Sequence, residues 1–180
     1  MSIDLRFPEA SDADAIFAAV RESIDALHPW MPWCRMDFAL ADASEWIVAQ
    51  PAAREAGSAF EFVIVDGQGR ALGCCGLNHI HKEHRIANLG YWVRSSATGR
   101  GVGTEAAQRV AAWAFAHTDL ERLEIVAAVG NTASQAVAAK AGALREGVLR
   151  SRLLIHGTFH DAVMFSLLRP QNAVARGGGE

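Results

Sequence analysis

The first third of the chain carries apolar residues at the spacing of helices. Ser11 is a helix start signal, and the apolar residues after it recur three or four positions apart, at Ile16, Val20, Ile24 and Leu27. The prolines of "LHPWMPWC" cannot continue this helix, so that segment is predicted to be a loop. A second start signal, Asp42 with Glu45, predicts a second helix that ends at about Ala53.

The middle of the chain changes to the pattern of strands. "SAFEFVIVDGQGRALGCCGLNHI" predicts two strands joined by a tight turn at 66–69, and "IANLGYWV" predicts a third. A helix follows, with one face formed by Val102, Ala106, Val110, Trp113 and His117. The apolar run "LERLEIVAAV" then predicts a buried strand. A strand, a helix and a strand in this order are the parts of a parallel pair with a right-handed crossover.

The last third of the chain continues the alternation of helix and strand patterns, and its final residues show no such pattern. "NTASQAVAAKAG" has an N-cap candidate in Asn131 and a C-terminal glycine in Gly142, which predicts a short helix. "ALREGVLRSRLLIHG" and "TFHDAVMFSLLR" predict two more strands. We therefore predict one α/β domain over 1–168, with a mixed sheet between two helical layers (α/β/α), and a flexible C-terminal tail over 169–180.

Composition and charge narrow the classes of partner. The chain has 180 residues and a net charge of −3, so it lacks the broad basic field that nucleic-acid binding requires. No apolar stretch approaches the roughly 18 residues of a membrane span, and the amino end lacks the pattern of a signal peptide. Cys34, Cys74 and Cys75 cannot all pair, and the adjacent two would point to opposite faces of a strand. We expect a cytoplasmic protein with reduced thiols and neither a membrane nor a nucleic-acid partner.

The glycines of "SSATGRGVGTEA" stand directly before the helix that begins at Val102. Gly99, Gly101 and Gly103 occupy alternate positions, and glycines at such a strand-to-helix junction let phosphates approach the main chain. A Walker A loop is excluded because no lysine follows the glycines. A dinucleotide-binding loop matches poorly, because the spacing is G-x-G-x-G and the next strand lacks the ribose-binding acid. A glycine-rich turn without a ligand is the remaining alternative.

A larger pattern around these glycines resembles a known family. "NLGYWVRSSATGRGVGTEA", followed by "NTASQAVAAKAGALREGVLR", resembles the acetyl-CoA-binding core of the GNAT N-acetyltransferases, and the similarity extends from about Leu5 to Leu168. Within that superfamily, "LHPWMPW", "GYWV" and the spacing of Asn131 and Ser134 are most similar to the ribosomal-protein N-terminal acetyltransferases. The resemblance implies a GNAT-fold acyltransferase that moves an acetyl group from acetyl-CoA to a primary amine, directly and without a metal.

The resemblance also implies where acetyl-CoA binds. Backbone N–H groups at the helix N-terminus would hold the pyrophosphate, and the pantetheine arm would pair with the third predicted strand. The family signature has a long polar residue where this chain has Thr98, and a strand bulge, for which Gly90 is the candidate, would turn a backbone N–H toward the thioester. The implied cofactor contacts are Trp92, Val93, Thr98, Gly99, Arg100, Gly101, Val102, Gly103, Thr104, Asn131 and Ser134.

Acetyl transfer from a thioester needs a proton for the departing thiolate. Ser134 is the expected donor, because in similar enzymes a serine at this place reaches the cofactor sulfur. Ala138 stands where other members of the superfamily have a tyrosine. An ordinary helix-start serine that bonds only to the main chain is the alternative for Ser134.

The reaction also needs a neutral amine. Many family members carry a glutamate where this chain has Asn88, which cannot accept a proton at neutral pH. The candidate bases are Glu61 and His79, with His81 and His84 as further options. A base-free reaction stays open, because an α-amine with a pKa of about 8 is roughly a tenth neutral at pH 7.

The tryptophans of the "LHPWMPW" loop are the expected acceptor site. The resemblance places Trp30 and Trp33 in the acceptor groove, and Asn88 and Tyr91 of the third strand are expected to contact the acceptor too. The leading acceptor is a protein or peptide N-terminal α-amine. A small-molecule amine and a non-catalytic acyl-CoA-binding module are the alternatives. Dimers are common among similar proteins, but no surface stripe indicates one here.

Overall fold

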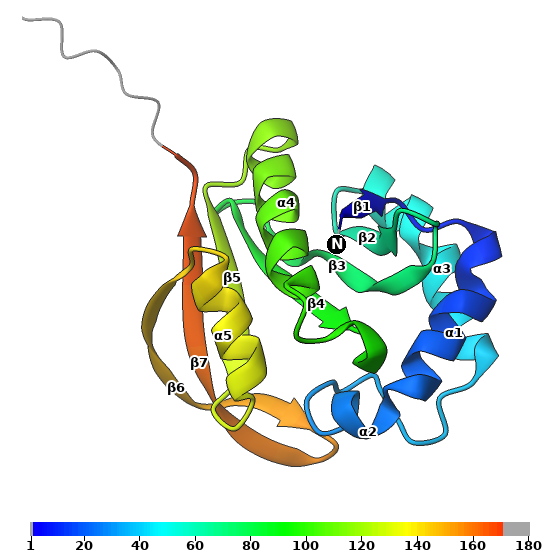
Figure 1. The fold of residues 1–180 in the computed structure, drawn as a ribbon. Coiled ribbons are helices and arrows are strands. Elements are labelled where there is room, and N and C mark those ends of the chain that lie inside the picture. The colour runs from blue at the N-terminus through cyan, green and yellow to red at the C-terminus, as the bar shows by residue number, and fades with distance from the viewer. Residues whose placement is uncertain (1, 171–180) are drawn as a thin grey trace, which may run out of the picture.

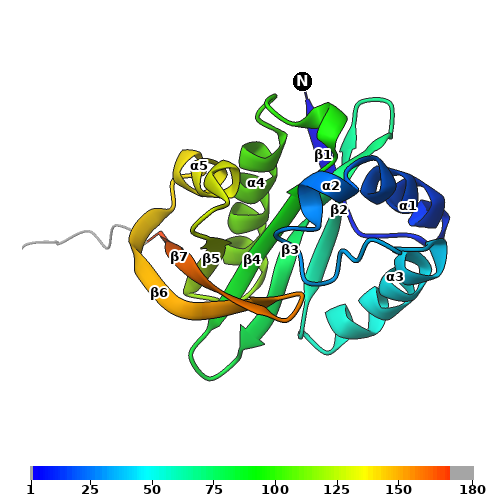
Figure 2. The ribbon, with the colours of Figure 1, turned by 90° about the horizontal axis from the view of Figure 1, so that it is seen from below.

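A seven-stranded mixed sheet forms the centre of the molecule, with helices on both faces (Figures 1 and 2). The computed structural model describes residues 2–170. The strands are β1 (Ile3–Arg6), β2 (Phe60–Asp66), β3 (Ala71–His81), β4 (Ile86–Val93), β5 (Arg122–Ala128), β6 (Leu144–Ile155) and β7 (Thr158–Leu168). The helices are α1 (Ala13–Glu22), α2 (Ile24–Leu27), α3 (Leu40–Glu55), α4 (Val102–His117) and α5 (Thr132–Lys140), with 3-10 turns η1 (Ala10–Asp12) and η2 (Ser95–Ala97).

The order of strands across the sheet is β1-β2-β3-β4-β5-β7-β6. Among these described strands, the pair β4–β5 alone is parallel, and α4 provides its crossover. The parallel register runs from Ile86 opposite Arg122 to Asn88 opposite Glu124 and then stops. The two strands therefore separate beyond Asn88, which gives the sheet an opening in its middle.

The sheet has a separate hydrophobic core on each face, which confirms the predicted three-layer arrangement. One core joins α4 and α5 to the sheet and includes Cys75, while the other joins α1, α2 and α3 and includes Cys74. The adjacent cysteines thus point to opposite faces, as expected from strand alternation. Both thiols and that of Cys34 are buried and free. No helix of residues 2–170 combines the length and apolar character needed to cross a membrane.

The boundaries of the N-terminal elements differ from the sequence prediction. The sequence pattern does not predict β1, because four residues are too few for a clear alternation; the strand forms by pairing with the edge of β2. The first apolar stripe is divided between α1 and α2 at Ser23. Asp42 is not the N-cap of α3: the helix begins at Leu40, and the Asp42 side chain accepts a hydrogen bond from the N–H of Ala39 (2.8 Å).

The end of the chain is described only up to residue 170. Arg169, the first residue of the expected tail, donates hydrogen bonds to the carbonyl oxygens of Phe115, Thr118 and Leu120. Its guanidinium thus attaches the end of β7 to the end of α4. Residues 171–180 of the expected tail lie outside the described residues.

Candidate active site

The opening between β4 and β5 belongs to a cavity of about 1060 Å³. Its walls come from the α2–α3 loop, α3, the middle of the sheet, the start of α5 and β6. From Leu89 to Val93, β4 pairs with no strand of the described part of the chain on the side of β5. Alternate main-chain groups of this segment therefore face the opening, where an extended ligand can pair with them.

The glycine cluster lies beyond the end of β4, at the N-terminus of α4. Gly99 and Gly101 have φ of +73° and +80°, which L-residues with a Cβ rarely adopt, and both are exposed. Gly103 serves a different purpose: a Cβ there would lie 3.5 Å from the side chains of Val93 and Val137, so it permits close packing of α4, β4 and α5.

Six consecutive backbone N–H groups of this loop, from Gly99 to Thr104, donate no hydrogen bond of ordinary geometry to any residue within 2–170. They lie at the positive end of a 16-residue helix. This is the arrangement that holds phosphate oxygens at helix N-termini. The local sequence therefore forms a cradle for an anion, with no lysine required.

The side chains of the loop contribute less than its main chain. The hydroxyl of Thr98 donates to the carbonyl oxygen of Ser95 (2.9 Å), so Thr98 closes the preceding turn. Val102 is 3% exposed, and its side chain belongs to the core. Arg100 is exposed. None of the residues from Val93 to Thr104 lines the cavity; the loop lies outside it, beyond the end of β4.

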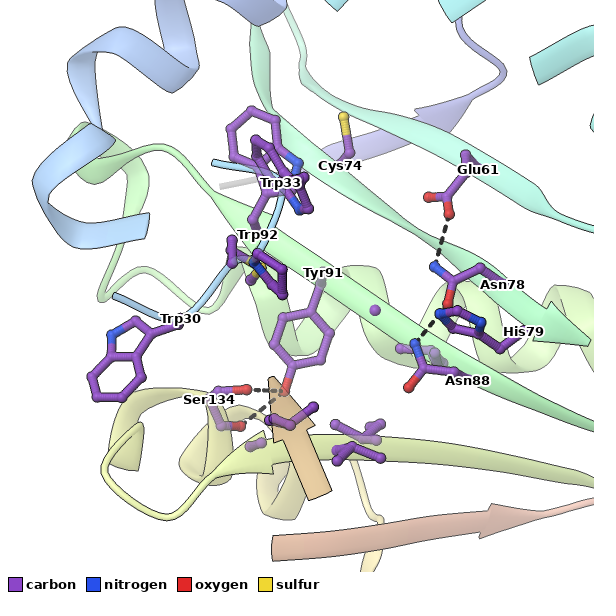
Figure 3. Close-up of a pocket in the computed structure, with 18 of the residues that line it drawn as sticks. Trp30, Trp33, Glu61, Cys74, Asn78, His79, Asn88, Tyr91, Trp92 and Ser134 are labelled. Carbon is purple, nitrogen blue, oxygen red and sulfur yellow. Dashed lines mark hydrogen bonds between the residues drawn. The ribbon is translucent and has the colours of Figure 1, made fainter. Parts of the chain in front are cut away.

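Ser134 and Tyr91 meet across the opening (Figure 3). The phenol of Tyr91 lies 2.8 Å from the carbonyl oxygen of Ser134 and 3.2 Å from its hydroxyl. Asn131 is the N-cap of α5, as predicted: its side chain accepts a hydrogen bond from the N–H of Ser134 (3.0 Å). Burial raises the pKa of Tyr91 to about 12, so the phenol stays protonated at physiological pH. Ala138 is fully buried one turn further along the helix.

Glu61 lies in the depth of the same cavity. Burial raises its pKa to about 7, while a hydrogen bond from the Asn78 amide (3.1 Å) acts in the opposite direction. Asn88 in turn donates to the side-chain oxygen of Asn78 (2.8 Å). A Cβ on Gly76 would collide with the Glu61 carboxylate, so Gly76 provides the space in which that group lies. The sequence pattern alone does not single out Asn78 or Gly76.

The histidines lie at the other end of the cavity, where β3 meets β4. His79 is exposed, with φ of +49°, and the register of β3 against β4 shifts between Asn78 and His81. This shift interrupts the strand alternation between His79 and His81, and His81 stacks on His84 with ring centroids 4.2 Å apart. No cluster of three or more His, Cys, Asp or Glu side chains within residues 2–170 is arranged to hold a metal ion.

The expected bulge at Gly90 is wrong with respect to β3. The register runs without a break from Asn78 opposite Asn88 to Gly73 opposite Val93, with Gly90 opposite Gly76. The separation of β4 from β5 instead begins where their pairing ends, after Asn88. The neighbouring irregularity is in β3, where Gly73 has φ of +150° and lies against the carbonyl of Trp92.

The tryptophans of the "LHPWMPW" loop line the side of the cavity formed by the α2–α3 loop. Trp33 is 40% exposed and packs against Trp92 with centroids 6.0 Å apart. The ring of Trp30 lies against Gly130 of the β5–α5 loop, on the other side of the opening. A Cβ on Gly130 would be only 3.1 Å from this ring. His28, just before this loop, stacks at 4.0 Å on His156 of the β6–β7 turn. The loop thus bridges both halves of the sheet.

Known proteins share this architecture. A model of the acetyltransferase (GNAT) domain family matches residues 3–144. YdaF of Bacillus subtilis (strain 168), which carries the provisional name ribosomal N-acetyltransferase, is 38% identical over 101 residues, 56% of this chain and 55% of its own. The ribosomal-protein-serine acetyltransferase of Escherichia coli (strain K12) is 26% identical over 95 residues, 53% of each chain. The matched part of the chain thus spans about half the length of these curated relatives.

A solved structure resembles the chain over a longer stretch. Mycobacterium smegmatis RimJ in complex with CoA-disulfide has a TM-score of 0.82 at 28% identity, over 92% of this chain and 81% of that one. The family match covers residues 3–144, more than half of the 180 residues, and includes the glycine cluster and the start of α5. The protein therefore belongs to the GNAT acetyltransferase family.

Proposed function

We propose that the protein is an acetyl-CoA-dependent N-acetyltransferase that acts on the N-terminal α-amine of a protein or peptide. The observation that carries this proposal is the row of six backbone N–H groups from Gly99 to Thr104 that have no hydrogen-bond acceptor within residues 2–170, at the end of the opening between β4 and β5. The N–H groups of the glycine loop fit the pyrophosphate of acetyl-CoA, and the unpaired edge of β4 fits its pantetheine arm. The cavity next to them fits the acetyl group. RimJ, bound to CoA-disulfide, supports this fit.

In this proposal the glycine loop and β4 hold the cofactor. The main chain from Gly99 to Thr104 binds the pyrophosphate, and exposed Arg100 adds a charge-assisted contact. Trp92 and Val93 present main-chain groups to the pantetheine arm, and Asn131 orients the start of α5 beside it. Thr98 and Val102 contribute only through their main chains, because the Thr98 hydroxyl and the Val102 side chain are already used within the fold.

Acetyl-CoA supplies an activated acetyl thioester, and the chain supplies the groups that move protons. Transfer forms the N–C bond of the new amide and breaks the C–S bond; the amine loses one proton and the thiolate gains one. Glu61, with its pKa near 7, accepts the amine proton. Ser134 lies at the opposite side of the cavity and delivers a proton to the departing thiolate. Solvent then returns a proton to Ser134 and takes up the proton that Glu61 accepted. Both reactants are bound together, so transfer is direct and needs no covalent enzyme intermediate.

The acceptor is assigned from the names of relatives and from the shape of the site. YdaF and the E. coli relative are named for ribosomal or ribosomal-protein substrates, and an α-amine demands little of a base because its pKa is about 8. Trp30, Trp33 and Tyr91 provide the apolar walls of a slot for the first residue of a peptide. His79, exposed at the far rim, remains the second candidate base.

A small-molecule amine is the second candidate acceptor, and one observation favours it. Asp42 and Glu45 of α3 line the cavity near the tryptophan loop, and such carboxylates attract a polyamine or another small cation. Arg35, however, forms an ion pair with Asp42 at 3.1 Å and neutralises it. Glu45 therefore remains as the main acidic group of that wall, which is less than a polycation would need.

Calorimetry followed by turnover tests the proposal. Acetyl-CoA is titrated into the protein with ATP and NAD as controls, and CoA release is then followed with a C-terminally amidated hexapeptide that begins with serine. The expected result is micromolar binding of acetyl-CoA alone and turnover with the free peptide but not with its N-acetylated form. Turnover with spermidine or free serine alone favours the small-amine alternative, and binding without turnover on any amine favours a non-catalytic acyl-CoA-binding module.

A further inference from the structure

Three strands present their polar residues on one face at the bottom of the cavity. The register places Glu61 of β2 opposite Gly76, Gly76 opposite Gly90, and Asn78 of β3 opposite Asn88 of β4. The Glu61 carboxylate fills the space that Gly76 leaves, and a Cβ on Gly90 would lie 3.6 Å from Asn88 Nδ2 and 3.8 Å from Asn78 Nδ2. All three polar side chains line the cavity, so this face is built around them.

The three side chains form a hydrogen-bonded chain with a fixed direction (Figure 3). Asn78 Nδ2 donates to Glu61 Oε1 (3.1 Å), and Asn88 Nδ2 donates to Asn78 Oδ1 (2.8 Å). An ionised carboxylate can only accept, so it requires the amide N–H₂ of Asn78 to face it. The Asn78 oxygen must then face Asn88, which in turn must offer its own N–H₂.

The direction of these hydrogen bonds decides which atom of the Asn88 amide faces the cavity. Its side-chain oxygen has no hydrogen-bond partner within residues 2–170, and no buried side-chain polar atom of that range lacks one, so this oxygen is accessible from the cavity. Figure 3 shows it on the side away from Asn78. A carbonyl oxygen at this place can accept an N–H of an incoming amine.

We propose that Glu61, Asn78 and Asn88 act as one unit, in which Asn78 is a positioning residue that turns the Asn88 oxygen toward the acceptor amine. This inference rests on the proposed function and deepens it. Glu61 uses Oε1 to fix the amide chain, while Oε2, above Gly76, stays free to accept the amine proton. Protonation of Glu61 removes the charge that fixes the chain, since a protonated carboxyl can donate to Asn78 and reverse both amides.

Other ionisable groups of the described residues line the same cavity on the elements around Glu61. From β3 the thiol of Cys74 lines the cavity, and burial keeps its pKa well above the ordinary value, so it is neutral. From α3 the carboxylates of Asp42 and Glu45 line the opposite wall, with Asp42 paired to Arg35. The histidines of the β3–β4 connection lie at the rim.

The far wall of the cavity carries three more ionisable groups. Glu124 of β5 is held by Arg122 at 2.8 Å, the phenol of Tyr91 stays neutral, and Arg152 of β6 lines the mouth. The hydrogen bond from Asn78 is thus the specific contact that favours the charged form of Glu61, against the cost of burial.

The test compares two variants that each remove one amide, Asn78→Leu and Asn88→Ala, with Glu61→Gln as the reference. The pH dependence of kcat/KM is measured with the serine hexapeptide. Wild type is expected to lose activity as pH falls through about 7, the value at which Glu61 takes up its proton. Asn78→Leu should move this acidic limb up by about one pH unit, because the carboxylate loses its donor.

Asn88→Ala keeps the bond between Asn78 and Glu61 and therefore serves as the matched control. Its acidic limb should stay in place, while KM for the peptide rises about tenfold through loss of the amine contact. The inference would be overturned if the acidic limb of the pH profile of kcat/KM stayed in place in Asn78→Leu. It would also be overturned if Glu61→Gln kept this limb.

A second readout separates this inference from the proposed function. Carbon NMR of labelled glutamate follows the Glu61 carboxyl in the free protein, with the signal assigned from Glu61→Gln. The titration midpoint should lie near pH 7 in wild type and higher in Asn78→Leu. If the midpoint moves as expected but no amine is acetylated, the amide chain stands and its role toward an acceptor is overturned. An identical titration midpoint in both proteins would show that the hydrogen bonds from Glu61 through Asn78 to Asn88 do not form.

Discussion

The phenol of Tyr91 lies 2.8 Å from the carbonyl oxygen of Ser134 and 3.2 Å from its hydroxyl, so one side chain of β4 holds the start of α5 across the opening of the sheet. The phenol has one proton. The phenol donates this proton to the Ser134 carbonyl oxygen, which can only accept, so in the contact between the two hydroxyls the Ser134 hydroxyl is the donor and the phenol oxygen the acceptor. Tyr91, expected from sequence as an acceptor contact, thus also orients the candidate proton donor.

Tyr91→Phe tests this orientation. Loss of one hydrogen bond to the reacting hydroxyl should lower kcat about tenfold. The KM for acetyl-CoA should change little, because the phenol does not touch the glycine loop. Steady-state kinetics at saturating peptide measures the effect.

Ser134→Ala provides the comparison for that variant. If both residues act through the serine hydroxyl, the double variant should be no slower than Ser134→Ala alone. Full activity of Ser134→Ala at saturating substrates, with the pH profile of wild type, would show that Ser134 delivers no proton.

Gly101→Val tests the anion cradle. Gly101 has φ of +80°, and no atom of the described residues lies within 4 Å of the position that a Cβ would take, so valine would strain the backbone and cover the N–H groups without colliding with that part of the fold. The Kd for acetyl-CoA should rise at least tenfold, whereas the free energy of unfolding should fall by only about 1–2 kcal/mol.

Gly69→Val is the matched control for the cradle. Gly69 has φ of +79° and equally open surroundings, but it lies in the β2–β3 turn. It should lose the same stability and keep the affinity of wild type for acetyl-CoA. If both variants lost the same affinity for acetyl-CoA, the glycine cluster would have only a structural role.

Glu61→Gln should change how stability depends on pH. The folded chain keeps its Glu61 proton up to about pH 7, whereas an unfolded glutamate loses it near pH 4.5. Wild-type stability therefore falls as pH rises through this window, by up to about 3 kcal/mol. Glutamine removes this dependence, so urea unfolding at pH 8 should show the variant to be more stable than wild type.

Glu45→Gln is the control for that measurement, because Glu45 lines the same cavity but is exposed. It should keep the pH dependence of wild type. A Glu61→Gln protein that is less stable than wild type at pH 8 would contradict the buried position of the carboxylate.

Glu22 should support cofactor binding from outside the cavity. Its carboxylate accepts hydrogen bonds from Arg94 and from the N–H of Ser96, and these lower its pKa to about 2. Glu22→Gln should raise the Kd for acetyl-CoA several-fold, because α1 then holds the segment before the glycine loop less firmly.

The pH dependence of stability provides a separate measurement for Glu22. The stability contributed by the ionised carboxylate is present above about pH 4.5 and is lost as pH falls toward 2. In Glu22→Gln this loss should be smaller. An unchanged affinity together with an altered stability would limit Glu22 to a structural role.

Local patterns are enough to predict most of the fold and the backbone geometry of the glycine loop. The glycine cluster, the N-cap at Asn131 and the alternation of Cys74 and Cys75 depend on neighbours in sequence, and the structure contains all three features. The predicted start of α3 is wrong because Asp42 caps the helix from its third position rather than from its N-cap.

The hydrogen bonds within the site cannot be predicted in this way. The bond between Tyr91 and Ser134 spans 43 positions, and the chain from Glu61 through Asn78 to Asn88 depends on the register of three strands. A register is set by packing over a whole sheet, and a shift of one residue would send these side chains to the other face. Sequence provides the candidates but not their contacts.

The most direct test of the proposed function is mass spectrometry of the serine hexapeptide after incubation with the protein and acetyl-CoA. We expect a gain of one acetyl group on the N-terminal amine, dependent on both protein and acetyl-CoA and abolished when that amine is blocked. An unmodified peptide under conditions where acetyl-CoA binds would contradict the proposal, and acetylation at a lysine side chain instead would contradict the assigned acceptor.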